Sequence, residues 1–161
     1  MALSCKKLAV IFAVTVTFSF LSLQAMCVKT KTATIRSEAN KSAKELVMLS
    51  QYTPVKWSGQ KKNGFFEIIE KSGIKGWVKV SEVSVSLICL QIKTNRIVLR
   101  SGPGNEFDKI NTQIKKGDSF LDLGGEDGWT QIQNSKGETG WVQIDKTWKP
   151  TSTTRLSFEN E

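Results

Sequence analysis

The chain has 161 residues, of which 39% are hydrophobic and 24% are charged, and its net charge is +8 at pH 7. This balance is typical of a folded globular protein and excludes a disordered or fibrous one. The absence of histidine excludes Ser-His-Asp and Cys-His catalytic sites and every histidine-containing zinc site. The cysteines Cys5, Cys27 and Cys89 are too far apart for a CxxC metal site. We therefore expect a binding protein without a cofactor or metal rather than an enzyme.

The N-terminal segment has the pattern of an export signal. Residues 1–7 carry two positive charges and no acidic residue, and residues 8–23 form an uncharged apolar run shortly before Ala25. We expect residues 1–25 to be a signal peptide that is cleaved after Ala25. Export would place the protein in the periplasm, outside the cell or at the cell surface, and argues against a nucleic-acid partner. A membrane is expected as a partner only if the signal stays uncleaved or if Cys27 carries a lipid.

Cleavage would leave Cys27 and Cys89 as the two cysteines of the mature chain. In an oxidising compartment they can pair and close a loop of about 60 residues, a stabilisation of up to about 4 kcal/mol by loop entropy. The alternative is two buried thiols that act as small hydrophobic side chains. The sequence leaves both alternatives open.

The mature chain repeats itself. Three short motifs recur at a displacement of 64 residues: Ile35-Arg36-Ser37 and Leu99-Arg100-Ser101, Asn63-Gly64-Phe65 and Asp127-Gly128-Trp129, and Gly76-Trp77-Val78 and Gly140-Trp141-Val142. Between them the displacement changes to 65, so that Leu49 corresponds to Ile114 and Val55 to Phe120. A displacement shared by three motifs indicates an internal duplication. We expect two units at residues 27–83 and 87–148, followed by a disordered tail at residues 149–161.

Each unit has the pattern of short β-strands. In the second unit, residues 96–100, 119–123, 129–133 and 139–144 are separated by turns rich in Gly, Asn and Asp, which predicts an all-β fold of two small barrels or sandwiches. Simple alternation would place Asp122 in the core beside Phe120, so we expect a bulge or sharp twist in that strand. Residues 80–92 lack Pro and Gly, and we expect the two units to pack closely in a fixed orientation.

One series of motifs in the second unit points to a known family: Leu99-Arg100-Ser101-Gly102-Pro103-Gly104, Lys115-Lys116-Gly117-Asp118, Asp127-Gly128-Trp129, Gly137 and Gly140-Trp141-Val142. This series resembles a bacterial SH3 domain (SH3b). The first unit is similar but departs from the pattern at Ser37-Glu38-Ala39-Asn40 and at Tyr52-Thr53. The resemblance implies two small, partly open SH3-like β-barrels in tandem with a non-catalytic role. Such domains often attach exported proteins to the cell wall, and others bind proteins or peptides.

Four aromatic residues fall on the strand face opposite the apolar one: Phe65, Trp77, Trp129 and Trp141. We interpret them as exposed ligand contacts, because exposed rings stack on sugars and peptide planes. The alternative is that they cover the barrel ends or the junction between the units. The resemblance adds that Trp129 and Phe65 fall where eukaryotic relatives keep a groove tryptophan. Those relatives also need several tyrosines, and the only tyrosine here is Tyr52, so a proline-rich ligand is not expected.

Positive charge is concentrated in the first unit, where residues 26–86 carry 11 basic and 5 acidic side chains. Lys61, Lys62 and Lys75 are the predicted partners of an anionic ligand, such as teichoic acid, a lipid headgroup or a wall-peptide carboxylate. The alternative is a solvated lysine-rich surface. Arg36 and Arg100 each precede a turn, and we expect them to anchor its carbonyl groups.

The sequence thus predicts an exported, non-catalytic module that recognises cell-envelope polymer or peptide, with peptidoglycan as the ligand that the SH3b resemblance implies. The first alternative is a protein–protein adaptor in the periplasm or at the cell surface. The second is the targeting half of a wall hydrolase whose catalytic domain is a separate chain. Carboxylate pairs that a glycosidase would need, Glu67 with Glu126 or Asp122 with Asp127, are expected to be structural or solvated.

Overall fold

The computed structural model describes residues 24–150, so the expected signal peptide and tail lie largely outside it. The first sheet contains β1 (Gln24–Val28), β2 (Thr32–Arg36), β3 (Glu45–Ser50), β4 (Pro54–Lys62), β5 (Phe65–Ile69), β6 (Lys75–Lys79) and β7 (Val83–Ser84), with the 3-10 helix η1 (Val80–Glu82). The second contains β8 (Cys89–Ile92), β9 (Leu99–Arg100), β10 (Lys109–Ile110), β11 (Ser119–Glu126), β12 (Trp129–Gln133), β13 (Thr139–Gln143) and β14 (Thr147–Trp148), with η2 (Ile144–Lys146). No helix in this part of the chain is long and apolar enough to cross a membrane.

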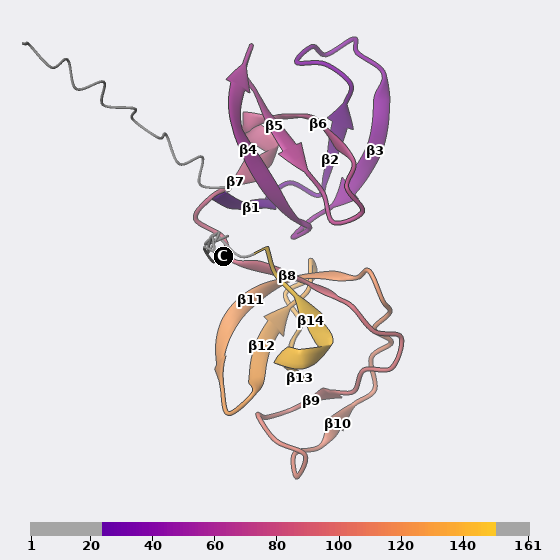
Figure 1. Ribbon diagram of the computed structural model, residues 1–161. Helices are drawn as coiled ribbons and strands as arrows, with labels where there is room; N and C mark the ends of the chain where they lie inside the picture. The colour runs from indigo at the N-terminus through magenta and orange to yellow at the C-terminus, as the bar shows by residue number, and fades with distance from the viewer. Residues whose placement is uncertain (1–23, 151–161) are drawn as a thin grey trace, which may run out of the picture.

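The two sheets have the same strand order. The first runs β3-β2-β6-β5-β4-β1-β7 and the second β10-β9-β13-β12-β11-β8-β14, so each strand has a counterpart in the other unit (Figure 1). All of the pairings are antiparallel, and neither sheet closes into a barrel. The predicted all-β class with two small units is confirmed, and each unit is an open sheet.

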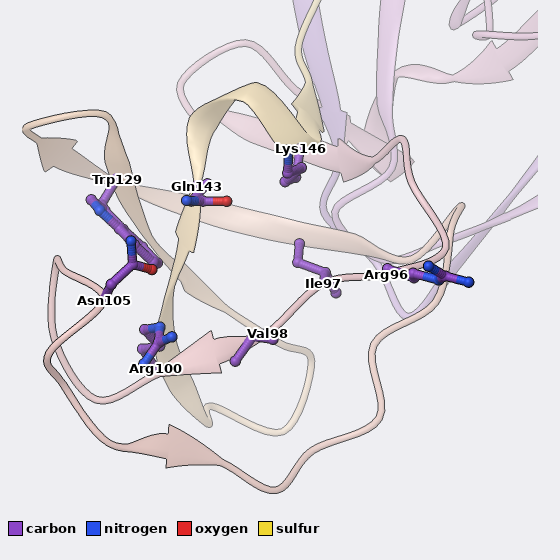
Figure 2. A pocket seen from close by; sticks show the side chains of 8 residues that line it. All are labelled: Arg96, Ile97, Val98, Arg100, Asn105, Trp129, Gln143 and Lys146. Carbon is purple, nitrogen blue, oxygen red and sulfur yellow. The ribbon is translucent and has the colours of Figure 1, made fainter.

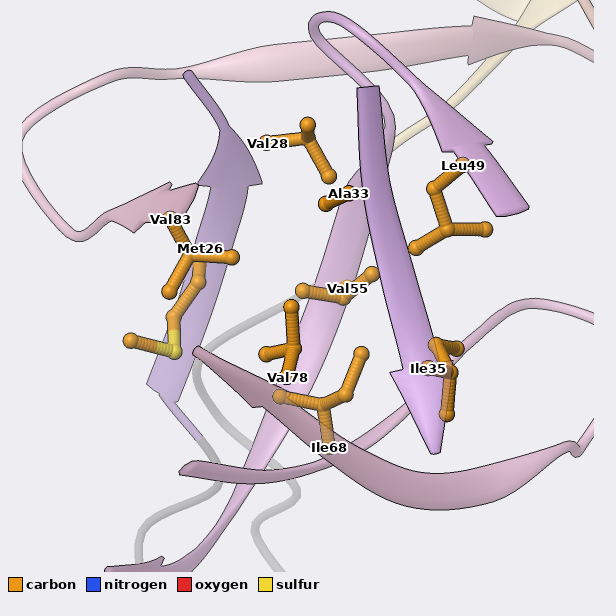
Figure 3. Close-up of a cluster of buried hydrophobic side chains, with 9 residues drawn as sticks. All are labelled: Met26, Val28, Ala33, Ile35, Leu49, Val55, Ile68, Val78 and Val83. Carbon is orange, nitrogen blue, oxygen red and sulfur yellow. The ribbon is translucent and has the colours of Figure 1, made fainter. Parts of the chain in front are cut away.

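The cores of the two units are built from corresponding positions. The first core consists of Met26, Val28, Ala33, Ile35, Leu49, Val55, Ile68, Val78 and Val83, whose side chains gather between the strands (Figure 3). The second consists of Leu90, Ile92, Leu99, Ile114, Phe120, Ile132 and Val142. Leu49 and Ile114, like Val55 and Phe120, occupy equivalent places. The change of displacement from 64 to 65 residues is therefore confirmed in the packing.

Two-residue turns join β4 to β5 and β11 to β12. Asn63 and Asp127 have φ of 49° and 47°, and the glycines that follow, Gly64 and Gly128, have φ of 78° and 82°. Two successive residues with positive φ form the turn whose twist matches that of an antiparallel hairpin, and Asn-Gly and Asp-Gly adopt it most readily. The repeated motifs thus mark the same turn in both units.

The two arginines anchor their turns as expected. The Nη1 atom of Arg36 donates a hydrogen bond to the carbonyl oxygen of Ala43 at 3.1 Å, and Nη1 of Arg100 donates to the carbonyl oxygen of Phe107 at 2.6 Å. In both cases the acceptor lies seven residues further along the chain. The loops after β2 and β9 are therefore held by equivalent bonds.

The bulge expected at Asp122 is confirmed. The pairing of β11 with β12 changes register between Asp122 and Gly124. The Asp122 side chain is only 4% exposed, and its carboxylate forms an ion pair with Lys149. It also accepts hydrogen bonds from the Thr130 hydroxyl at 2.6 Å and from the Gly124 N–H at 3.0 Å. The inward carboxylate is thus fully provided with partners, as a buried charge requires.

The contacts that join the two units include a disulfide, a hydrogen bond and a cation–π contact. Cys27 and Cys89 form a disulfide between β1 and β8, with their Cα atoms 5.8 Å apart. The hydroxyls of Thr53 and Ser119 hydrogen-bond at 3.2 Å. The Nζ atom of Lys71 lies 5.4 Å from the centre of the Trp148 ring, within the range of a cation–π contact. Because the Cys27 sulfur is bonded to Cys89, it is not free to carry a lipid.

Candidate binding site

The expectation that the four aromatic rings are exposed is wrong for two of them. Phe65 is 4% exposed and Trp129 is 7% exposed, although neither belongs to the core clusters. Trp77 and Trp141 are half-buried. The rings therefore lie on the outer strand face, as alternation predicts, but the face is covered at Phe65 and Trp129.

A backbone contact beside these two rings recurs in both units. The N–H of Val80 donates to the carbonyl oxygen of Gly64 at 3.0 Å, and the N–H of Ile144 donates to that of Gly128 at 2.9 Å. These bonds hold η1 and η2 beside the residues that follow the two glycines, Phe65 and Trp129. A period of two residues separates the faces of a strand, but it does not say what packs on the outer one.

The three predicted lysines do not form one cluster. Lys61 lies over the Phe66 ring, with Nζ 5.6 Å from its centre. Lys75 pairs with Glu67 at 3.1 Å. Lys62 lines a hollow of about 310 Å³ together with Trp77, which makes it the one predicted lysine that the structure brings to a predicted ring.

A hollow of about 130 Å³ in the second unit contains Trp129 (Figure 2). Its lining comes from the segment before β9, from β9 and its loop, and from β12, β13 and η2: Arg96, Ile97, Val98, Arg100, Asn105, Trp129, Gln143 and Lys146. In Figure 2, Trp129 and Asn105 lie at one end, and Lys146 and Arg96 lie toward the other. The lining includes three cations and no carboxylate, so it favours an anionic group.

Arg100 is the most constrained cation of this hollow. Its Nη1 atom is bonded to the Phe107 carbonyl, but its Nε atom is buried and has no hydrogen-bond partner within residues 24–150. A buried N–H without a partner is costly, and such groups are rare in folded proteins. An acceptor in the hollow would supply the missing partner only if the guanidinium group turned toward it, because the Nε atom has almost no exposed area as it stands.

The other two cations remain available to a ligand. Arg96 is exposed. Lys146 pairs with the neighbouring Asp145 at 2.6 Å, but the Asp145 side chain is 66% exposed. An exposed pair of this kind contributes little to stability, so a bound anion can replace Asp145 at low cost.

The first unit does not reproduce this charge. The counterpart of Arg96 is Thr32, and that of Lys146 is Glu82, which pairs with Lys79 at 3.5 Å. Arg36 corresponds to Arg100, but it differs from Arg100 in having a carboxylate partner, Glu45, at 2.9 Å. The candidate anion site thus belongs to the second unit, although most of the basic residues belong to the first.

The carboxylates of Glu67 and Asp122 are already bound by neighbouring side chains of the protein. Burial raises the pKa of Glu67, but hydrogen bonds from Ser58 and Lys75 outweigh this effect and hold the pKa below its ordinary value. The pKa of Asp122 is lowered in the same way, since bonds from Lys149 and Thr130 exceed the effect of burial. Neither carboxylate lines the hollow around Trp129. Within residues 24–150 no cluster of His, Cys, Asp and Glu has the geometry to hold a metal ion.

No protein-family model matches the chain, and no curated protein matches it. Solved structures with a similar arrangement include NlpC2 from Trichomonas vaginalis, at 15% identity and a TM-score of 0.37 over 82% of this chain and 50% of that one. NlpC1 from the same organism has 16% identity and a TM-score of 0.37, over 83% of this chain and 48% of that one. The chain spans about half the length of these proteins, and a similarity this weak supports no conclusion about function.

Proposed function

We propose that the protein is an exported, non-catalytic binding module of the SH3b type that recognises cell-envelope polymer or peptide, with peptidoglycan as its ligand. The contact is made in the hollow around Trp129, which receives a carboxylate or similar anionic group of the ligand. The observation that carries the proposal is the lining of this hollow, which includes three cations, Arg96, Arg100 and Lys146, and no carboxylate.

The chemistry of the hollow suits the end group of a longer molecule. A guanidinium group binds a carboxylate through two parallel hydrogen bonds, and the Trp129 ring supplies an apolar surface beside it. The volume of about 130 Å³ is below that of sites which enclose a whole small molecule. One charged group therefore enters, while the rest of the ligand stays outside.

Retention on purified sacculi at low and high salt tests the proposal, using residues 24–161 so that β1 is complete. We expect the wild type to be retained at low salt and retained less at high salt, because screening weakens contacts between charges. Arg100→Met and Arg96→Gln should each reduce retention several-fold. Arg36→Met is the matched control, because it removes the same turn anchor from the first unit and should be retained like the wild type.

Two results would contradict this assignment. Undiminished retention of both Arg100→Met and Arg96→Gln would show that the hollow is not the site. Failure of the wild type to bind sacculi at either salt concentration would favour the adaptor function, in which a unit docks an envelope protein.

A further inference from the structure

A second hollow, of about 430 Å³, crosses the junction of the two units. The first unit contributes Thr32, Ser50 and Gln51, and the second contributes Thr112, Gln113 and Asn134. The lining has one cation, Lys31, and one anion, Asp118, whose carboxylate already accepts the Lys115 N–H at 2.7 Å. This junction groove is therefore polar but nearly neutral, unlike the hollow around Trp129.

A chain of hydroxyl groups fixes the two sides of the junction groove. Ser50 Oγ and Thr53 Oγ1 are 3.2 Å apart, and Thr53 Oγ1 is 3.2 Å from Ser119 Oγ. Thr53 is 6% exposed, so the middle of this chain is shielded from solvent. Thr53 is the counterpart of Asp118 in the second unit. The first unit departs from the repeat pattern at this position, and the residue found there bonds to the second unit. With the disulfide, these bonds hold the groove open in one geometry.

The junction groove has an apolar side as well. Ile114 and Phe120 line it and also line an adjoining hollow of about 270 Å³, which reaches the core residues Leu99 and Ile132. This opening exists because β10 spans only Lys109–Ile110, whereas its counterpart β3 spans Glu45–Ser50. The second core is therefore reachable from the groove.

We infer that the junction groove is a second binding site and that it takes a neutral sugar chain. Hydroxyl and amide side chains both donate and accept hydrogen bonds, as sugar hydroxyls do. The apolar C–H faces and acetyl groups of sugars can pack on Ile114 and Phe120, which an ion would not favour. The inference goes beyond the proposed function, because this site has its own lining, lies across both units and does not require an anionic ligand.

Isothermal titration of the chain from residue 24 to residue 161 with the N-acetylglucosamine tetramer tests this inference. We expect binding that is insensitive to salt, because the probe is uncharged. The double variant Gln51→Ala, Gln113→Ala, with one change in each unit, should weaken it at least tenfold, and Thr112→Arg should block the groove. Gln60→Ala, a change at an exposed glutamine outside the groove, should bind the tetramer like the wild type.

The proposals for the junction groove and for the hollow around Trp129 can be refuted independently. Absence of tetramer binding by the wild type, or equal binding by the wild type, the double variant and Thr112→Arg, would overturn the junction site. Sacculus retention that depends on Arg100 would leave the proposed function intact in each of these cases.

Discussion

At one equivalent strand position, the first unit has an aromatic contact and the second unit has an ionic one. Trp57 pairs across the sheet with Ile68, and Asp122 pairs with Ile132, so Trp57 and Asp122 are counterparts. In the first unit, the Trp57 ring meets the Phe66 ring edge-on, with centres 5.2 Å apart. In the second unit, the Asp122 carboxylate accepts a hydrogen bond from Thr130, the counterpart of Phe66, and pairs with Lys149.

This difference shows that the fold requires a bulge at this position but allows different side chains next to it. The strand pairing changes register directly after Trp57 and directly after Asp122. The aromatic solution is local to two neighbouring strands. The ionic solution also needs Lys149, which follows the last strand, so the second unit depends on its C-terminal residues in a way that the first does not.

The largest loss of stability is expected on removal of the Trp57 ring from the first unit. Trp57→Ala removes one ring of the aromatic pair that packs on the first core, and we expect a loss of about 2–3 kcal/mol in the free energy of unfolding. Urea denaturation of the oxidised protein measures this loss. Trp141→Ala, which removes a half-buried ring outside the core clusters, is the control and should cost less. Equal losses would mean that the aromatic pair has no special part in the first core.

An intermediate loss of stability is expected on removal of the charge of Asp122, the counterpart of Trp57. Asp122→Asn removes the charge that Thr130 and Lys149 contact, and we expect a loss of about 1–2 kcal/mol at pH 7, because Lys149 is partly exposed and its charge is screened. The pKa of Asp122 is lowered in the folded protein, because hydrogen bonds from Lys149 and Thr130 outweigh burial. The carboxylate therefore stabilises the fold above its unfolded pKa of about 4, and this contribution is lost as the pH falls through the folded value.

The pH dependence distinguishes a charge effect from a shape effect. The difference in unfolding free energy between the wild type and Asp122→Asn should be greatest above about pH 4 and should shrink in more acidic solution. Denaturation curves at a series of pH values would show this. A difference that stays constant across the series would mean that the ion pair with Lys149 is not what stabilises this region.

The smallest effect is expected at a more exposed ion pair in the first unit, which is not the counterpart of the pair at Asp122. The Lys75 side chain, which contacts Glu67, is 55% exposed, so Lys75→Met should change the unfolding free energy by less than about 0.5 kcal/mol. Lys149→Met should cost more, since its partner Asp122 is almost fully buried. Thermal unfolding of the two variants side by side compares them. The reverse order would show that Glu67 depends on its lysine more than Asp122 does.

The features predicted correctly from the sequence are those that depend on local spacing. The recurring motifs gave the duplication, and the conflict at Asp122 gave the bulge. The exposure of Phe65 and Trp129 was mispredicted, because alternation along a strand identifies its outer face but not what packs on that face.

The candidate site was only partly predictable for a similar reason. Trp129 was singled out from its face, but Arg96 and Lys146 were missed, because counting charge by unit directed attention to the lysines of the first unit. An alignment of the two copies would have shown that Arg96 and Lys146 take the places of Thr32 and Glu82 in the first unit. That these cations line the same hollow as Trp129 becomes evident only from the folded chain.

The disulfide also decides how the chain would carry a mechanical load. It joins Cys27, near the start of the first unit, to Cys89, at the start of the second. Tension applied between the two ends of the chain would run through this bond and bypass residues 28–88, which include β2 to β7. Such a pull could not extend residues 28–88, so within the first unit it would load only Gln24–Cys27 of β1. If the protein holds its ligand while its N-terminal end is fixed, the load would fall on the start of β1 and on the second unit.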